Sequence, residues 1–186
     1  GEAIGAFGLT EPDAGSDAAS LKTKAIRSGD SWVLNGTKQF ITNADCASVF
    51  TTIAVTDEQK RARGGFSAFI VEKDFAGFSV SPPDRKMGLK GSHTNEIVFR
   101  NCMVPRDNVI GGLDMVGMGF KTAMRVLDKG RLTMGACALG ASQKLLDLSA
   151  AQVKHQINTG KSKADLQAAQ FSLADMATEI YAARRM

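Results

Sequence analysis

Short segments rich in Val, Ile, Phe and Thr recur through the first 110 residues. They are 25–27, 31–35, 40–42, 49–55, 66–72, 78–80 and 95–99, and Gly, Asn, Asp or Pro stands between them. Strands this short, separated by turn residues, are typical of a β-sandwich or barrel. Asn35-Gly36 is the strongest hairpin signal, because both residues accept positive φ.

The pattern changes to a helical period after residues 109–112. From Gly119 onward, apolar residues recur three or four positions apart, at Phe120, Met124, Leu127, Leu132, Ala136, Leu139, Leu145, Leu146 and Leu148. Gly130, Gly135 and Gly140 lie inside this run, although glycine costs roughly 1 kcal/mol per helix-interior position relative to alanine. They fit either close approach by another helix or a ligand, or a weak helix that tertiary packing stabilises.

A second helix is expected after a break at residues 158–160. Gly160 suits a helix end with positive φ, and Ser162 can cap the next helix. The apolar face of that helix would comprise Leu166, Ala169, Leu173, Met176, Ala177 and Ile180. Two long antiparallel helices with a short connection form an αα-hairpin. The expected fold class is therefore α+β, with an all-β barrel or sandwich domain at 1–112 and a helical domain at 113–186.

Composition narrows the possible functions. The 186 residues are 44% apolar and 23% charged, as in ordinary globular proteins, and no apolar run is long enough to predict a transmembrane helix. The formal charge of +4 does not require a nucleic-acid partner and fits mild attraction for anions. Three separated cysteines and two histidines predict no metal site and an intracellular protein. The sequence starts without Met and stops within the second helix, so we expect a segment of a longer protein.

Residues 8–17 are unusual in their chemistry. They hold two glycines, two hydroxyls, three carboxylates and a proline. Such a loop can present N–H groups and hydroxyls to an anion, and Gly15 permits close backbone approach. The segment lacks the glycine spacing of a Rossmann turn and the lysine of a P-loop. Loop chemistry alone favours an ordinary surface turn.

The sequence nevertheless resembles the acyl-CoA dehydrogenase family. Residues 8–20, G-L-T-E-P-D-A-G-S-D-A-A-S, resemble its first signature, and 35–43, N-G-T-K-Q-F-I-T-N, are similar to its flavin-contacting hairpin. Residues 87–92 with Thr94 resemble the end of its β-domain, and 117–120 and 127–131 the start of its carboxy-terminal helical domain. The resemblance implies a middle β-domain followed by the first helices of a four-helix bundle, as a fragment of a larger α-β-α enzyme.

The family's chemistry sets the expected function. The resemblance implies non-covalently bound FAD and α,β-dehydrogenation of an acyl-CoA thioester to the trans-2-enoyl-CoA. A carboxylate base removes the α-proton while the β-hydrogen leaves as hydride to the flavin. An electron-transferring flavoprotein would accept the electrons, and a homodimer or homotetramer in the bacterial cytoplasm or mitochondrial matrix is expected. The alternatives are a flavin oxidase or monooxygenase on the same fold, or a non-catalytic homologue.

The resemblance also assigns binding positions. The expected cofactor-binding residues are Phe7, Leu9, Thr10, Gly15, Ser16, Phe40, Ile41 and Thr42. Phe40 stands where the family usually has tryptophan and would stack on the flavin, while Thr10 and Thr42 would bond to the ring. Ser16, Asp128 and Arg131 are the expected substrate contacts. Without the resemblance, Asp128 and Arg131 would be interpreted as an exposed helical pair worth about 0.3–0.5 kcal/mol.

Two departures from the family matter. Residues 156–159, Q-I-N-T, stand where the family usually has an arginine and a phenylalanine that reach the FAD of a neighbouring subunit. A family glutamate base can precede the arginine that matches Arg131, but Gly130 stands there. Glu11 is interpreted as a carboxylate that shapes its loop. We therefore expect the base beyond Met186, and the segment alone to be inactive.

Overall fold

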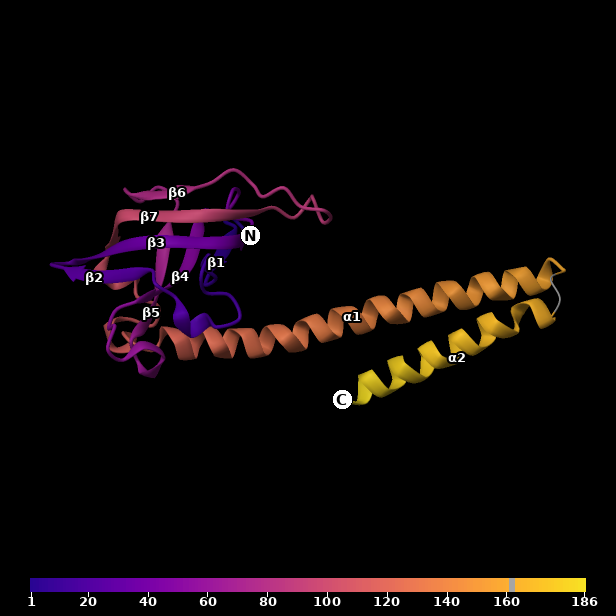
Figure 1. The fold of residues 1–186 in the computed structure, drawn as a ribbon. Coiled ribbons are helices and arrows are strands. Elements are labelled where there is room, and N and C mark those ends of the chain that lie inside the picture. The colour runs from indigo at the N-terminus through magenta and orange to yellow at the C-terminus, as the bar shows by residue number, and fades with distance from the viewer. Residues whose placement is uncertain (161–162) are drawn as a thin grey trace. The chain divides into compact units, whose positions relative to one another are not determined.

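The computed structural model of the chain describes residues 1–160 and 163–186. It divides into two compact units, Gly1–Arg125 and Val126–Met186, which are considered separately (Figure 1). The first unit contains the β-strands and the first turns of α1 (Gly119–Asn158). The second contains the remainder of α1 and the helix α2 (Lys163–Arg185).

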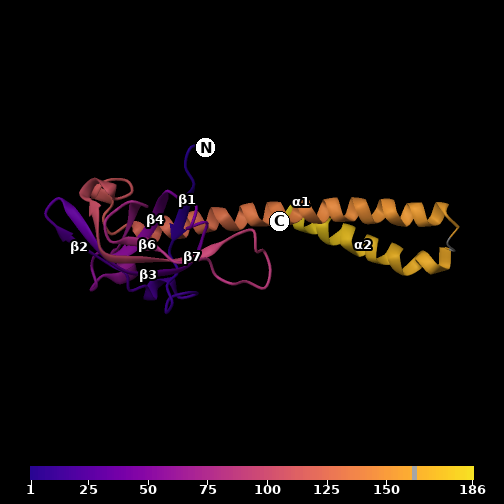
Figure 2. The same ribbon diagram turned by 90° about the horizontal axis from the view of Figure 1, so that it is seen from above.

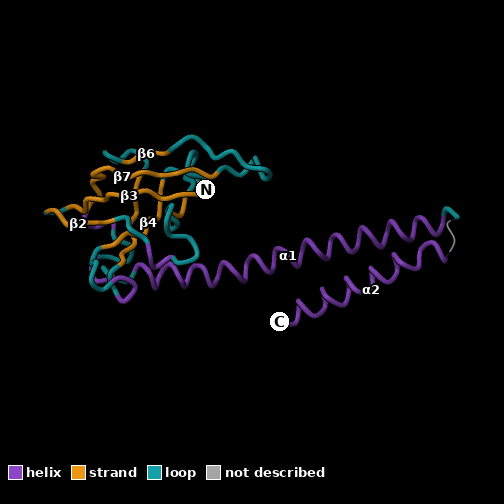
Figure 3. Tube along the Cα trace, viewed as in Figure 1, coloured by secondary structure: helices purple, strands orange, loops and turns teal. Residues whose placement is uncertain are grey.

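Seven strands of the described residues form one mixed sheet, drawn in orange in Figure 3. They are β1 (Gly5–Gly8), β2 (Lys24–Ser28), β3 (Ser31–Thr42), β4 (Val49–Val55), β5 (Phe66–Glu72), β6 (Phe78–Val80) and β7 (Thr94–Pro105). Their order is β1-β4-β2-β3-β7-β6, and β5 also pairs with β4. β1 and β4 run parallel, whereas β2–β3, β3–β7, β6–β7 and β4–β5 are antiparallel. This half-barrel confirms the α+β class.

The first unit has a continuous apolar core. Leu34, Phe50, Phe69 and Ile97 have no exposed surface and belong to one cluster that also contains Trp32. Burying a side chain of this size contributes roughly 1.5–3 kcal/mol. The predicted strands 49–55, 66–72 and 78–80 are confirmed with those bounds, while β1 was not predicted. Its four residues GAFG are too few and too glycine-rich to show a strand pattern.

The hairpin predicted at Asn35-Gly36 is wrong. The chain continues through these residues in β3, and β2 joins β3 at Gly29 and Asp30 instead. Asn35 faces a bulge in β7, where its side chain accepts the N–H of Asn101 at 2.8 Å. Gly36 is required by packing, because a Cβ there would lie 2.3 Å from Thr23 Oγ1. The turn-like dipeptide therefore marks a close approach of backbones within the sheet.

The second unit is a helical hairpin. α2 runs back alongside α1 (Figure 2), and Gly160 ends the turn after α1 with a φ of 95°. On the predicted face of α2, Leu166 is buried and Ala169, Leu173 and Ile180 are half-buried, whereas Met176 and Ala177 are exposed. The expected Ser162 cap lies outside the described residues. Among these residues, no helix is long and apolar enough to cross a membrane.

Candidate functional site

A β-bulge near the end of β3 places Phe40 on the surface. Lys38 pairs with Ile97 and Ile41 with Asn95, so β3 has one residue more than β7 over this stretch. Side chains at even positions of β3 point inward up to Lys38, but after the bulge Ile41 is the buried one. Phe40 consequently turns outward and is 59% exposed, with a φ of 58°. A bulge of this kind re-aims a side chain, here an aromatic ring flanked by the exposed Thr42.

The loop after β1 lies against this bulge. The N–H of Gln39 donates to the carbonyl of Thr10 at 2.9 Å, which brings Thr10 beside the residue before Phe40. Phe7 and Thr10 are half-buried and Leu9 is buried. The predicted contacts Leu9 and Thr10 are therefore close to β3 in space, although about 30 residues separate them in sequence.

The loop itself is tightly folded. Glu11 and Ala14 exchange two backbone hydrogen bonds, of 3.0 and 3.1 Å, across Pro12-Asp13. Gly15 and Ser16 follow and are exposed, and the side chain of Asp17 then caps the short 3-10 helix Ala18–Ser20. The loop thus leaves the glycine and hydroxyl of Gly15-Ser16 accessible to a ligand.

A buried ion pair lies beneath this loop. Lys38 Nζ is 2.8 Å from Glu11 Oε1 and donates to the carbonyl of Leu9 at 3.1 Å. The carboxylate of Glu11 also accepts the N–H groups of Lys22 and Thr23, at 2.6 and 2.9 Å. Lys38 has no exposed surface and the side chain of Glu11 is 5% exposed. The interpretation of Glu11 as a loop-shaping carboxylate is confirmed by these contacts.

Sequence reasoning missed Lys38 as the partner of Glu11. The available signal was its position in the strand. Lys38 lies an even number of residues after the core positions Trp32 and Leu34, so its side chain falls on the same face of the strand. Burial lowers the pKa of Lys38 to about 8, although Glu11 opposes this shift. Burial would raise the pKa of Glu11, but the Lys38 ammonium and the bonds from Lys38, Thr23 and Lys22 hold it below its ordinary value.

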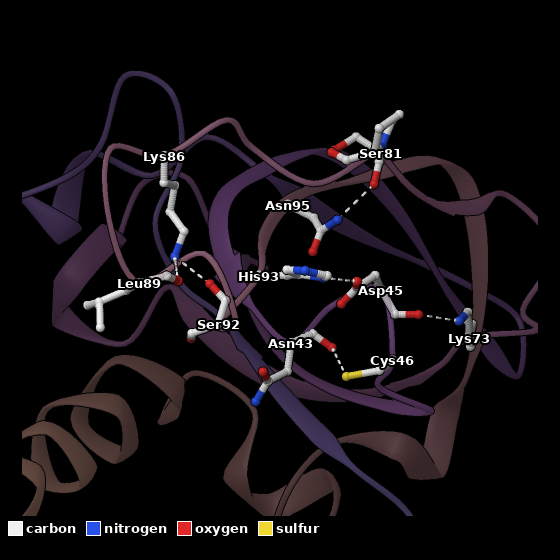
Figure 4. Close-up of polar contacts among 11 residues, drawn as sticks. Asn43, Asp45, Cys46, Lys73, Ser81, Lys86, Leu89, Ser92, His93 and Asn95 are labelled. Carbon is white, nitrogen blue, oxygen red and sulfur yellow. Dashed lines mark hydrogen bonds and ion pairs between the residues drawn. The ribbon is translucent and has the colours of Figure 1, made fainter.

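Polar contacts hold the backbone that follows Thr42. The N–H of Asn43 donates to the carbonyl of His93 at 3.0 Å, and His93 Nδ1 lies 2.5 Å from Asp45 Oδ2 (Figure 4). The hydrogen bond to His93 lowers the pKa of Asp45, whose carbonyl also accepts from Lys73 at 2.9 Å. His93 therefore connects the loop before β7 to the residues that follow β3, and its side chain is 47% exposed.

The remaining predicted contacts lie in the core of the first unit and on the surface of the second. Ile41 is 2% exposed and packs in the core, so it can offer a ligand only its backbone. In the second unit, Arg131 NH1 donates to Asp128 Oδ1, and the two side chains are 72% and 70% exposed. Arg131 also borders a hollow between α1 and α2 that is lined by Leu132, Gly135, Leu139 and Ile180. No described atom outside its own helix backbone approaches within 4 Å of a Cβ built on Gly130, Gly135 or Gly140.

The comparisons with known proteins cover both units. Residues 6–102 match the family described as "Acyl-CoA dehydrogenase, middle domain", and residues 117–186 match "Acyl-CoA dehydrogenase, C-terminal domain". A probable acyl-CoA dehydrogenase of Mycobacterium tuberculosis is 48% identical over 184 residues, which are 99% of this chain and 46% of that protein. The chain belongs to the acyl-CoA dehydrogenase family.

Solved structures agree with this assignment. Butyryl-CoA dehydrogenase from Megasphaera elsdenii has a TM-score of 0.87 and 41% identity, covering 98% of this chain and 47% of that one. A chain of the electron transferring flavoprotein structure from Acidaminococcus fermentans also has a TM-score of 0.87, with 44% identity and the same coverage. The chain spans about half the length of these relatives.

The surface around the β3 bulge fits a flavin. An isoalloxazine ring needs an apolar face on which to stack and hydrogen-bond partners along its polar edge. The exposed ring of Phe40 would supply the first, and the hydroxyls of Thr42, which is exposed, and Thr10, which is half-buried, would supply the second. The left-handed backbone of Phe40 is uncommon for a residue other than glycine, and such conformations cluster at functional sites. These residues are therefore the candidate flavin contacts of the first unit.

Proposed function

We propose that this chain carries the flavin-binding and part of the substrate-binding machinery of an FAD-dependent acyl-CoA dehydrogenase. The observation that supports this most directly is the β3 bulge, which exposes Phe40 beside the loop of Thr10 in a chain that belongs to this family. The reaction is α,β-dehydrogenation of an acyl-CoA thioester to the trans-2-enoyl-CoA. FAD would supply the hydride acceptor when bound.

The proposed roles of the β-unit residues follow from their settings. Phe40 would stack against the ring, Thr10 and Thr42 would donate hydroxyls to it, and Ile41 would contribute backbone only. Phe7, Leu9 and Gly15 would shape the surface, and Ser16 would contact both FAD and the acyl-CoA. In the helical unit, Asp128 and Arg131 would exchange part of their mutual pairing for the thioester arm of the substrate.

The catalytic base is proposed to lie outside residues 1–186. Gly130 precedes Arg131 and has no side chain that could remove a proton. Glu11 is engaged by Lys38 and by two backbone N–H groups, so it is not free to act as a base. A glutamate in the remaining half of the protein would remove the α-proton.

Partners and domain limits are proposed on the same basis. The likeness to a chain of an electron transferring flavoprotein structure supports such a flavoprotein as the electron acceptor. We propose a middle domain at 1–112, a helical domain at 113–186, and a homodimer or homotetramer. The compared relatives are bacterial, which favours the bacterial cytoplasm.

An anaerobic absorption spectrum tests the proposed function. The full-length protein should purify with a flavin spectrum that acyl-CoA bleaches, and an electron-transferring flavoprotein should restore the colour. Rapid reoxidation by oxygen would indicate an oxidase, and a protein that neither contains nor binds flavin would contradict the proposal. The 186-residue segment supplied with FAD should not turn over acyl-CoA, because it lacks the proposed base.

A further inference from the structure

One buried ion pair connects the two segments that carry the proposed flavin contacts. Lys38 precedes Phe40 by two residues in β3, and its ammonium reaches Glu11 and the Leu9 carbonyl on either side of Thr10. The single carboxylate of Glu11 also fixes the backbone at Lys22 and Thr23. Three stretches of chain that are distant in sequence therefore meet at one pair of charges.

Stability alone does not explain charges at this position. Removing an ion from water costs several kcal/mol even after relaxation, so an apolar pair of similar volume is often as stable or more stable. The charged pair differs from an apolar one in direction, because each hydrogen bond fixes a distance and an angle. Glu11 and Lys38 together accept or donate four such bonds, of 2.6–3.1 Å.

We propose that Lys38 and Glu11 are positioning residues for the flavin surface, which hold the loop of Thr10 in register with the bulge that exposes Phe40. Both side chains are buried, so they act through Thr10 and Phe40 and do not contact the cofactor themselves. This inference rests on the proposed function, because the surface that the pair positions is the proposed flavin surface.

The test measures FAD affinity and folding separately in the full-length protein. The double variant Lys38→Met with Glu11→Leu replaces the pair by apolar side chains of similar size. The protein is stripped of flavin and titrated with FAD, while urea unfolding of the apoprotein reports stability. Leu34→Ala is the matched control, because Leu34 is fully buried in the same strand and its truncation leaves a cavity without touching the pair.

If the pair positions the flavin surface, the change in FAD affinity should not follow the change in stability from one variant to the other. The double variant leaves the N–H groups of Lys22 and Thr23 and the carbonyl of Leu9 without these partners, so its urea midpoint should fall, as that of Leu34→Ala does. Its Kd for FAD should nevertheless rise roughly tenfold to a hundredfold, as when an outer-shell partner is removed from a metal site. Its bound flavin should also show a shifted visible spectrum. Leu34→Ala should unfold at a lower midpoint and keep the wild-type Kd. Wild-type affinity in the double variant would overturn the inference.

A second variant decides the matter if the double variant does not fold. Glu11→Gln keeps the volume and the oxygen that faces Lys38 but removes the charge and the acceptor for one backbone N–H. It should raise the Kd for FAD severalfold, and an unchanged Kd would overturn the inference. A wild-type protein that binds no flavin would overturn the proposed function and this inference together. Wild-type binding with unaffected variants would overturn the inference alone.

Discussion

The two units differ in how far they bury an ion pair and their large apolar side chains. The first unit buries the pair Lys38–Glu11 and encloses large residues such as Phe50 and Phe69 completely. The second leaves the pair Asp128–Arg131 in solvent and exposes Leu132, Leu145, Leu148 and Phe171 on its two helices. Two helices alone cannot cover apolar residues that lie on several faces. The β-unit therefore has its own core, whereas we propose that further helices of the protein complete the core of the helical unit.

Amide hydrogen exchange on the 186-residue chain would show the largest difference. Core strands exchange only through global opening, which at about 5 kcal/mol or more slows exchange roughly a thousandfold or beyond. Amides of β3 and β4 should show this protection, whereas those of α2 should exchange within a small factor of the unfolded rate. In the full-length protein, α2 should become protected. Equal protection of both units in the 186-residue chain would contradict the proposal that the helical unit needs further helices to complete its core.

Two lysine substitutions compare a buried with an exposed ion pair. Lys38→Met should lower the free energy of unfolding by about 3–5 kcal/mol, because it leaves the Glu11 carboxylate buried without its partner. Lys22→Met removes an ion pair with Asp13 whose side chains are 69% and 71% exposed, and should cost at most about 1 kcal/mol. Urea unfolding followed by the fluorescence of Trp32, the single tryptophan of the chain, measures both. Similar losses would mean that burial does not determine the strength of the pair.

The sequence predicted the elements of the fold better than their connections. Strands 49–55 and 66–72 had clear apolar runs bounded by turn residues, and the helical period after Gly119 was long enough to identify α1. The joining of 31–35 and 40–42 into β3 was not predictable, because it depends on pairing with β7, a strand more than 50 residues away. Asn35-Gly36 shows why, since positive φ serves a close strand contact as readily as a hairpin.

The candidate site was predictable in its residues but not in its geometry. The resemblance assigned Phe40 and Thr42, yet only the bulge shows that Phe40 faces solvent while Ile41 faces the core. A lysine within a strand is ordinarily interpreted as solvent-exposed. Lys38 is buried because Glu11, on the loop that follows β1, supplies a counter-charge. The two residues are 27 positions apart, so sequence periodicity cannot reveal the pair.

Alkaline pH should change the stability of the β-unit through Lys38. The pKa of Lys38 falls from 10.5 to about 8 on burial, so between these values the folded state has released a proton that the unfolded state retains. Unfolding then takes up a proton, and the free energy of unfolding should rise with pH across this window. The rise is at most about 3 kcal/mol, at about 1.4 kcal/mol per pH unit.

Comparison with Lys38→Met isolates this effect from the titration of other groups. Urea unfolding of both proteins is measured at several values between pH 7.5 and pH 10, because the pKa of Lys38 in the folded protein is about 8. The free energy of unfolding of the wild type should rise with pH relative to that of Lys38→Met. A difference that stays constant would mean that Lys38 keeps its proton throughout this range.

The smallest expected effect on stability concerns the exposed pair of the helical unit. Asp128→Asn in the full-length protein should change the free energy of unfolding by no more than about 0.5 kcal/mol, because the pair is a solvent-exposed helical contact. Asp147 provides a matched control, since it lies on the same helix and accepts an exposed hydrogen bond from Gln143 at 3.0 Å. If Asp128 contacts the thioester arm, Asp128→Asn should raise the KM for acyl-CoA severalfold while Asp147→Asn leaves it unchanged. Equal KM values in the two variants would reduce Asp128 to the exposed helical pair that its spacing alone suggests.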